Sequence, residues 1–285
     1  MKKLLLILLC LPMIFSSCKK EDEEPINSGN NNGQTYVPDD NFEQKLIDLG
    51  LDNTLDNYVN TSSIDTLKYL NISAMPEWTG DPNNPFNYLM PIYDLTGLED
   101  FISLTNLDCS NNPITSLNQI ESLTQLEWLS CRRTNITNLN LFDNVNMNIV
   151  QCSYSPIESI NTSGAVNLEG LYCYETPLKS LNLSKNVELE KLDCYNTILT
   201  ELNLSNNSQL TYLQIFNSNP LPTYSNGTEL TNLNVKNGHN QTLTHLRVQG
   251  NMNLNCIQVD NNSPYLQPDS SYMLDPHQFH SEVCP

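Results

Sequence analysis

The sequence predicts an α/β solenoid, a stack of short repeated turns, because its small apolar residues recur at a fixed period. Five cysteines stand 22, 21, 21 and 21 residues apart: Cys109, Cys131, Cys152, Cys173 and Cys194. A constant period in this range is typical of stacked supersecondary units. Other small apolar residues continue the series on both sides, namely Ile72, Ile215, Val235 and Val248.

A second observation is the run of apolar residues in front of each member of this series. The residue two positions earlier is Leu107, Leu129, Val150, Leu171, Leu192, Leu213, Leu233 or Leu246. One turn alone cannot bury such a face, but parallel strands about 4.8 Å apart make it a continuous core. We therefore expect the cysteines to point inward as small apolar side chains. Side chains in such a row run parallel, which suits neither a disulfide nor a metal site, and we expect no metal and no cofactor.

The frame L-x-x-L-x-C resembles the leucine-rich repeat, in which a short strand is followed by a polar turn and a return arm. The asparagine of that family is present as Asn112 and Asn251, and the other turns have Thr134, Ser155, Thr176, Thr197 and Ser218 there. Apolar residues in steps of three between Leu95 and Leu126 are similar to the internalin subtype and favour 3₁₀ turns in the return arm. The resemblance implies a leucine-rich-repeat horseshoe with its parallel β-sheet on the concave face.

The N-terminus carries a predicted export signal. Lys2 and Lys3 precede an apolar run from Leu4 to Phe15 that is too short to span a bilayer. The run ends in F-S-S-C, which resembles the lipobox of bacterial lipoproteins and implies that Cys18 is acylated. The following K-K-E-D-E-E segment resembles surface-exported lipoproteins of the Bacteroidetes. We expect a lipid anchor in the outer membrane that faces the cell exterior, and a generic solvated tether is the alternative reading of the charged run.

These observations divide the chain. We expect a signal peptide at 1–17, the lipidated cysteine and a disordered tether at 18–35, and an N-terminal cap with an amphipathic helix at 36–66. The repeat domain spans 67–260 with an insertion at 74–91, and a C-terminal cap covers 261–285. The V-P-D-D-N-F-E-Q segment at 37–44 and the N-L-N-C-I-Q-V-D segment at 253–260 look like leucine-rich-repeat surface proteins of Flavobacterium-like bacteria.

Two cysteines remain outside the repeated series and the signal. Cys256 and Cys284 can oxidise in an exported chain, and we expect their disulfide to tie the C-terminal cap to the last strand.

The residues that flank each buried position should face solvent on the strands, and function is expected there. Aromatic and charged residues gather in these positions. The candidate ligand-binding residues are Trp128, Arg132, Tyr172, Tyr174, Lys191, Asp193, Tyr195, Tyr212 and Phe216. Exposed aromatic side chains of this kind serve binding sites for proteins and sugars. The alternative is that the rings stabilise neighbouring strands by stacking across the sheet.

Charge limits the class of partner. Removal of Lys2 and Lys3 with the signal leaves 11 of the 13 basic residues against 32 acidic ones, a net charge near −21. This argues against nucleic acid and against direct adhesion to an anionic membrane.

The four histidines share no spacing that suggests a catalytic triad, so we expect no catalysis. We expect an adhesin-like or adaptor-like protein, monomeric or part of a surface complex, that binds a protein or polysaccharide. The alternatives are a structural subunit of an outer-membrane assembly and, more remotely, a glycan-processing enzyme.

Overall fold

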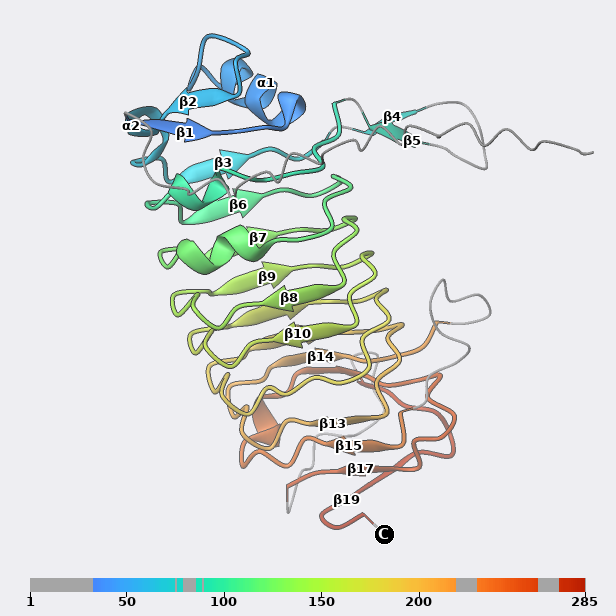
Figure 1. The fold of residues 1–285 in the computed structure, drawn as a ribbon. Coiled ribbons are helices and arrows are strands. Elements are labelled where there is room, and N and C mark those ends of the chain that lie inside the picture. Colours follow the sequence, from blue (N-terminus) through green and yellow to red (C-terminus); the bar gives the residue numbers. More distant parts are fainter. Residues whose placement is uncertain are drawn as a thin grey trace, which may run out of the picture.

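The computed structural model describes residues 33–74, 76–78, 86–88, 90–218, 230–260 and 272–284. Its main element is a nine-stranded sheet of parallel neighbours (Figure 1). In spatial order the strands are β3 (Tyr69–Asn71), β6 (Asn106–Asp108), β7 (Trp128–Ser130), β9 (Ile149–Gln151), β11 (Gly170–Tyr172), β12 (Lys191–Asp193), β14 (Tyr212–Gln214), β16 (His245–Arg247) and β18 (Tyr272–Met273). The predicted parallel-stranded solenoid is confirmed.

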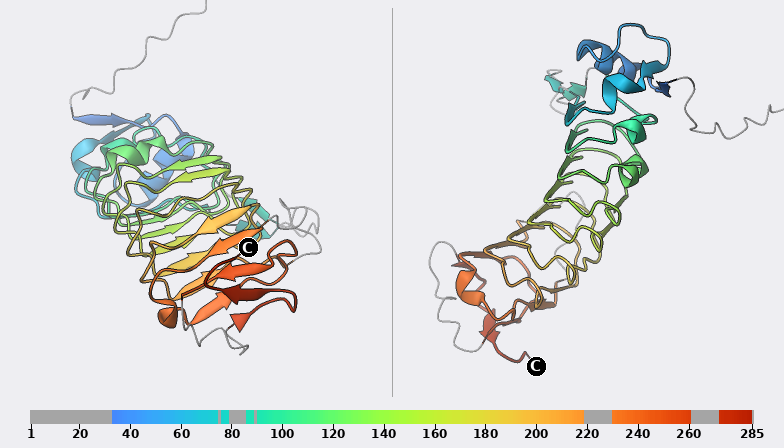
Figure 2. Two further views of the ribbon diagram at one scale, coloured as in Figure 1. Left: turned by 90° about the horizontal axis from the view of Figure 1, so that it is seen from below. Right: turned by 90° about the vertical axis from the view of Figure 1, so that its left-hand side faces the viewer.

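Several of the turns have a second parallel strand on their other side, and these strands form a second layer. β8 (Asn138–Asn140) pairs with β10 (Ser159–Asn161), and a four-stranded sheet has the order β13 (Glu201–Asn203), β15 (Asn232–Asn234), β17 (Cys256–Gln258) and β19 (Phe279–Ser281). Figure 2 shows the result as an elongated stack with the N-terminal helices at one end and the C-terminal strands at the other.

One member of the predicted series belongs to this second layer. Val235 follows β15, which pairs with β13 in the four-stranded sheet, so its inclusion with the cysteines was wrong. In the nine-stranded sheet β14 pairs directly with β16. The sequence L-x-V at 233–235 matches either layer, because both layers place alternating apolar side chains inside the same core.

The core lies between the two layers. All five cysteines of the series are fully buried and are free thiols, as predicted for small apolar side chains in this position. The return arms contain three 3₁₀ helices, η1 (Leu98–Asp100), η2 (Asn118–Ser122) and η3 (Asn240–Thr242). The first two confirm the prediction from the threefold apolar spacing.

Short polar side chains satisfy the buried backbone where each strand turns. The Oγ1 atoms of Thr176 and Thr197 donate to the carbonyl oxygens three residues earlier, at 2.7 and 2.9 Å. Asn112 donates from Nδ2 to the carbonyls of Ile72 and Cys109 at 2.8 and 3.1 Å. A buried carbonyl without such a donor would destabilise the fold, so these hydrogen bonds stabilise the turn conformation.

The N-terminal end is closed by α1 (Asp40–Asp48), α2 (Thr61–Ile64) and an antiparallel pair, β1 (Gln34–Tyr36) with β2 (Tyr58–Asn60). Asp39 caps α1 by accepting hydrogen bonds from the backbone of Asn41 and Phe42, both at 3.0 Å. The expected helix therefore forms. The predicted tether at 18–35 extends too far, because β1 begins at Gln34 and Thr35 is buried.

The insertion at 74–91 contains two short strands. β4 (Pro76–Trp78) and β5 (Phe86–Tyr88) pair in antiparallel fashion. Ala74 and Ile92, on either side of them, are buried. The insertion is thus anchored to the solenoid at both of its ends.

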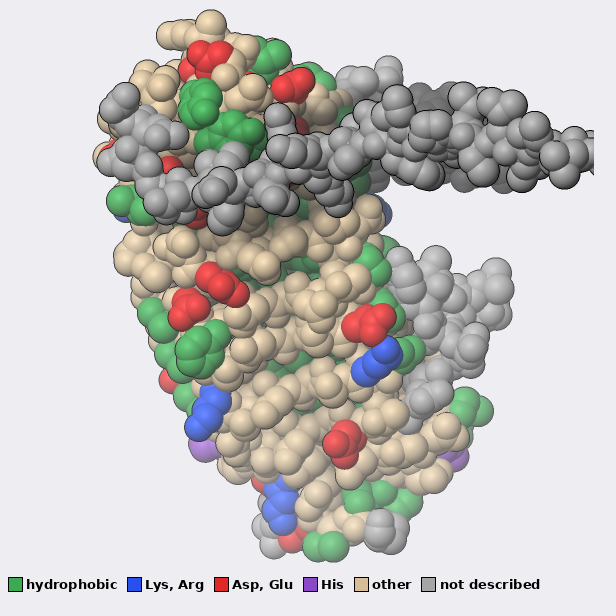
Figure 3. Space-filling view, viewed as in Figure 1, with side chains coloured by type: hydrophobic (Ala, Val, Ile, Leu, Met, Phe, Trp, Pro, Cys, Tyr) green, Lys and Arg blue, Asp and Glu red, His purple; other side chains and the backbone are tan. Residues whose placement is uncertain are grey.

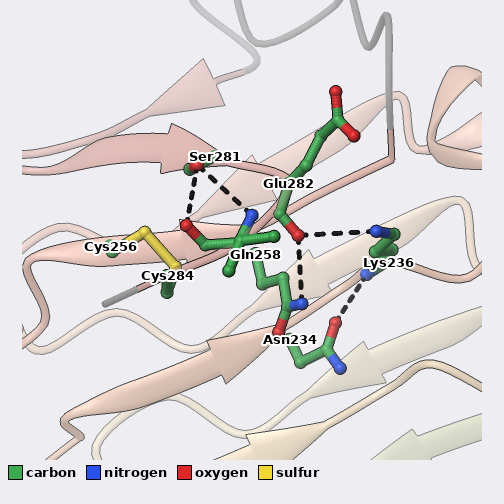
Figure 4. Close-up of a disulfide and its surroundings, with 8 residues drawn as sticks. Asn234, Lys236, Cys256, Gln258, Ser281, Glu282 and Cys284 are labelled. Atoms are coloured by element: carbon green, nitrogen blue, oxygen red, sulfur yellow. Dashed lines mark hydrogen bonds between the residues drawn. A yellow bond between two sulfur atoms is a disulfide. The ribbon is translucent and has the colours of Figure 1, made fainter.

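The described part of the segment expected as the C-terminal cap, residues 272–284, adds strands to both sheets. β18 joins the nine-stranded sheet and β19 joins the four-stranded sheet, each in parallel register. A disulfide links Cys256 to Cys284, with their Cα atoms 5.7 Å apart. Figure 4 shows that the neighbouring Glu282 carbonyl accepts hydrogen bonds from Gln258 and Lys236.

Among the described residues, no helix has the length and apolar character needed to cross a membrane.

Candidate functional site

The candidate ligand residues lie on the solvent side of the nine-stranded sheet, in rows set by strand register. Along one row the pairing is Gly170, Lys191, Tyr212 and His245. The next row along the strands contains Tyr172, Asp193, Gln214 and Arg247. Because side chains alternate along a strand, both rows face away from the core.

Just beyond the strands, aromatic rings from successive turns stack on one another. We call Tyr154, Tyr174, Tyr195 and Phe216 the aromatic stack. The ring of Tyr174 lies 4.5 Å from Tyr195 at an interplanar angle of 9°, and that of Tyr195 lies 4.7 Å from Phe216 at 11°. Tyr154 meets Tyr174 edge to face at 5.3 Å. The ring faces therefore cover each other, and the stack presents ring edges, while the Tyr174 hydroxyl is engaged by Arg132.

Arginines close both ends of the aromatic stack. The Arg133 guanidinium lies 4.7 Å from the centre of the Tyr154 ring, and Arg132 lies about equally far from Tyr154 and Tyr174. Arg132 also donates from Nη2 to the Tyr174 hydroxyl at 3.0 Å. At the other end, Arg247 lies 5.2 Å from the Phe216 ring centre. Such contacts attract the cation to the ring and hold the guanidinium in place.

An unusual backbone row supports the same edge. Positive φ angles between 52° and 61° occur at Asn111, Arg133, Tyr154, Glu175 and Asn196. Left-handed backbone is uncommon outside glycine and asparagine. Each of these residues follows its ladder cysteine by two positions, so the turn that projects Arg133 and Tyr154 repeats in register.

Asp193 lies at the base of the site, between Tyr172 and Gln214. Its side chain is 9% exposed, and Oδ1 is buried without a hydrogen-bond partner. Burial raises the pKa of this carboxyl to about 6, although the Tyr195 backbone N–H and Arg247 act in the opposite direction. Charge at the base of the site therefore changes near neutral pH.

Tyr212 and His245 form a second stacked pair on the other side of Asp193. Their rings lie 4.4 Å apart at an angle of 6°, and the Gln214 side chain contacts both the Tyr212 hydroxyl and His245 Nε2. Burial raises the pKa of Tyr212 and lowers that of His245, and the Arg247 charge contributes to the second shift. Both groups are thereby held neutral at physiological pH.

The structure brings most of the predicted ligand residues together. Tyr174, Tyr195 and Phe216 form the core of the aromatic stack, and Arg132 joins it. The base and flank of the site hold Tyr172, Lys191, Asp193 and Tyr212. Trp128 lies apart, two strands from Gly170 in the same register row.

Three further residues of the site were not predicted from the sequence. Tyr154 and Arg133 occupy the position two beyond the ladder cysteine, where an extended strand would not place them with the other rings. The left-handed backbone at these two residues directs their side chains toward the aromatic stack. Arg247 stands 31 residues after Phe216 in the sequence, which exceeds the 21-residue period of the cysteines. Cys18, the predicted lipidation site, lies outside the described residues.

The opposite side of the solenoid has a different character. Figure 3 shows it as a broad surface of mostly uncharged polar atoms over the second layer of strands. A hollow of about 520 Å³ lies there, lined by Ser180, Leu181, Asn182, Ser184, Glu201, Leu202, Asn203, Ser205, Asn206, Asn232, Asn234 and Gln258. Its lining lacks the aromatic and arginine side chains that mark the nine-stranded face.

No protein-family model matches the chain, and no curated protein sequence matches it. Among solved structures, internalin C2 of Listeria monocytogenes is similar with a TM-score of 0.54 and 16% identity, covering 86% of this chain and 95% of that one. A leucine-rich-repeat protein of Leptospira interrogans has a TM-score of 0.42 and 19% identity over 57% and 45% of the two chains. At such identities the likeness extends to the fold alone: this chain has a leucine-rich-repeat solenoid fold of the kind seen in internalins.

Proposed function

We propose that this protein is a non-catalytic lipoprotein of the cell surface that binds a macromolecular partner through the nine-stranded face. Its role is that of an adhesin or adaptor, held at the outer membrane by a lipid on Cys18. One observation carries the proposal, namely the partly exposed aromatic stack with arginines at both ends. Repeat solenoids present extended rigid surfaces, and aromatic and arginine side chains are enriched where binding energy concentrates.

The binding face is tested by replacing Tyr174, Tyr195 and Phe216 together with serine. We expect binding to be abolished, because each anchoring aromatic side chain contributes about 2 kcal/mol or more. The rings also stack across strands, so the melting temperature should fall as well, and affinity is therefore measured per folded molecule. The control replaces Tyr93 and Phe142, which are 63% and 56% exposed outside the stack. Unchanged affinity in the triple variant would move the site to the insertion that contains Trp78 and Tyr88.

The partner is identified by capture on the full-length protein in mild detergent. A host or environmental protein or polymer supports the adhesin or adaptor role. A constitutive neighbour from the same membrane would instead favour a structural subunit of an outer-membrane assembly.

Anchoring is tested separately by Cys18→Ser. The substituted protein should leave the membrane fraction or remain unprocessed, since this cysteine is the acylation site of the predicted lipobox. Continued incorporation of labelled lipid by the Cys18→Ser protein would contradict the lipoprotein proposal.

A further inference from the structure

The chain has three arginines, and all three lie against the aromatic stack. The whole sequence has 13 basic residues and 32 acidic ones. Arginine is thus scarce, and the few copies are concentrated on one face. Arg132 and Arg133 stand at one end of the stack, and Arg247 stands at the other.

The three guanidinium groups have few partners inside the protein. In the described part of the chain, the one ion pair joins Lys179 to Glu158, so no arginine has a carboxylate within ion-pair distance, although the Arg247 charge acts on Asp193 from farther away. Arg132 donates to the Tyr174 hydroxyl, and Arg247 donates to the sulfur of Met273 at 3.2 and 3.4 Å. Sulfur is a weak acceptor, and each guanidinium has five N–H donors. The hydrogen bonds of the described residues therefore use only a minority of these donors.

The contacts with the rings restrict the positions of the guanidinium groups. A planar guanidinium matches a carboxylate or sulfate by two parallel hydrogen bonds. Positioning before binding also reduces the entropy that binding must overcome. Both ends of the aromatic stack are consequently preorganised to bind anionic groups.

We propose that the nine-stranded face binds a linear acidic polysaccharide, with Arg132 and Arg133 holding an anionic group at one end of the aromatic stack and Arg247 holding another at the far end. This inference rests on the proposed function and specifies its ligand. From the strand before Arg132 to the strand that contains Arg247 there are five strand spacings, or roughly 24 Å. The ligand is therefore an extended chain several sugar units long.

The surface between the arginines favours a glycan over an acidic peptide. The backbone groups of the inner strands are engaged with neighbouring strands, so this face offers no free edge to which a peptide strand can add. Recognition must come from side chains, such as the half-buried amide of Gln151 and the ring edges of the aromatic stack. The stacked rings recur from turn to turn, and a pyranose unit of an extended polysaccharide has about the length of one strand spacing.

The charge distribution also limits the kind of polyanion. The mature chain is strongly acidic overall, and physiological salt screens exposed charges beyond about 8 Å. Three arginines at two separate points, with Lys191 between them, suit a polymer whose charges are widely spaced. Nucleic acid has one charge per 1.7 Å of duplex and needs a broad positive field, which this protein lacks.

The test measures binding of full-length protein in mild detergent to polygalacturonate, to a neutral mannan of matched length and to poly-L-glutamate, all at physiological salt. We expect polygalacturonate to bind and the other two polymers to bind at least about tenfold more weakly. The double variant Arg132→Gln, Arg133→Gln should lower polygalacturonate affinity about tenfold, and Arg247→Gln should also weaken it. The matched control, Lys185→Gln with Lys236→Gln, removes the same charge elsewhere and should change affinity less than about twofold.

Equal binding of mannan would overturn the anionic class of the ligand, and stronger binding of poly-L-glutamate would replace the glycan by an acidic peptide. Equal losses in the arginine and lysine variants would show that general charge, and not this site, is responsible. If no polysaccharide binds but a captured partner depends on Tyr174, Tyr195 and Phe216, this inference fails while the proposed binding face stands. If no captured partner depends on the stack, the proposed function itself fails.

Discussion

At the scale of the residue, Asp193 shows how burial opposes the ionisation of a carboxyl group. Its carboxyl has a pKa of about 6 in the fold, against 3.8 for the free side chain. Between these values the folded state binds more protons than the unfolded state does. The free energy of unfolding therefore falls as pH rises from about 4 to 6, and the full destabilisation is present above pH 6.

Asp193→Asn removes this titration. One pKa unit corresponds to about 1.4 kcal/mol, and partial solvent screening reduces the effect, so we expect a gain of about 1 to 2 kcal/mol at pH 7.5. At pH 4 the two proteins should be nearly equal in stability. Denaturant unfolding at both pH values measures the difference. A variant less stable than the parent at pH 7.5 would mean that the ionised carboxylate has a stabilising partner.

The ladder thiols are a second residue-scale case. Burial raises the pKa of all five well above the usual range, so each is held as an unreactive thiol. Alkylation of the native protein should be slow. Cys173→Ala should lower the free energy of unfolding by about 1 kcal/mol, whereas Cys173→Asp should unfold the neighbouring turns. Rapid native labelling of Cys152, Cys173 and Cys194 would contradict the inward register.

At the scale of the element, buried asparagines join consecutive turns beneath the second layer. Asn186 donates from Nδ2 to the carbonyls of Thr162 and Ala165 at 3.0 and 2.7 Å, and its Oδ1 accepts from the Thr162 hydroxyl at 2.8 Å. Asn144 and Asn207 make similar bonds in neighbouring turns. These side chains satisfy polar backbone groups that no strand pairing reaches.

Asn186→Ala leaves two buried carbonyls without this donor, and we expect it to lower the free energy of unfolding by about 2 to 4 kcal/mol. The control is Asn182→Ala, an exposed position whose side chain accepts from the Ser184 backbone at 3.1 Å. That change should cost under about 1 kcal/mol. Chemical unfolding of the two variants makes the comparison, and equal losses would show that burial of the amide is not the cause.

At the scale of the whole molecule, each turn contacts chiefly its neighbours, so stability is distributed along the stack. The Cys256–Cys284 disulfide closes a loop with a sequence separation of 28 at the C-terminal end. In the chain-entropy account a loop of this size contributes about 3 to 4 kcal/mol. Its effect should be local, because few contacts connect the last turns to the first ones.

We expect Cys256→Ser with Cys284→Ser to abolish amide-exchange protection in β17 and β19 while β6 and β7 remain protected. The Cys109→Ala variant at the other end should leave protection of β17 and β19 unchanged. Hydrogen exchange followed by mass spectrometry resolves the two ends. Uniform loss of protection along the chain would mean that the solenoid unfolds as a single cooperative unit.

The solenoid, its inward cysteines and the 3₁₀ helices between Leu95 and Leu126 could be predicted from the sequence, whereas the strands of the second layer could not. Every turn buries the same positions in one continuous core. The apolar residues at these positions, including Cys109 to Cys194, therefore recur in the sequence with a constant period. The hydrogen-bonding residues at the turns, such as Thr176 and Thr197, are readable for the same reason. Each of these features is local to one turn and is repeated.

The tertiary structure alone decided which layer a strand joins and which side chains meet between turns. Leu233 and Val235 have the same local pattern as the ladder, and pairing with β13 assigns them to the other sheet. Arg247 contacts Phe216 although 31 residues separate them in the sequence, and Tyr154 joins the stack through left-handed backbone. Such contacts depend on the register between turns and on backbone geometry, neither of which a single repeat encodes.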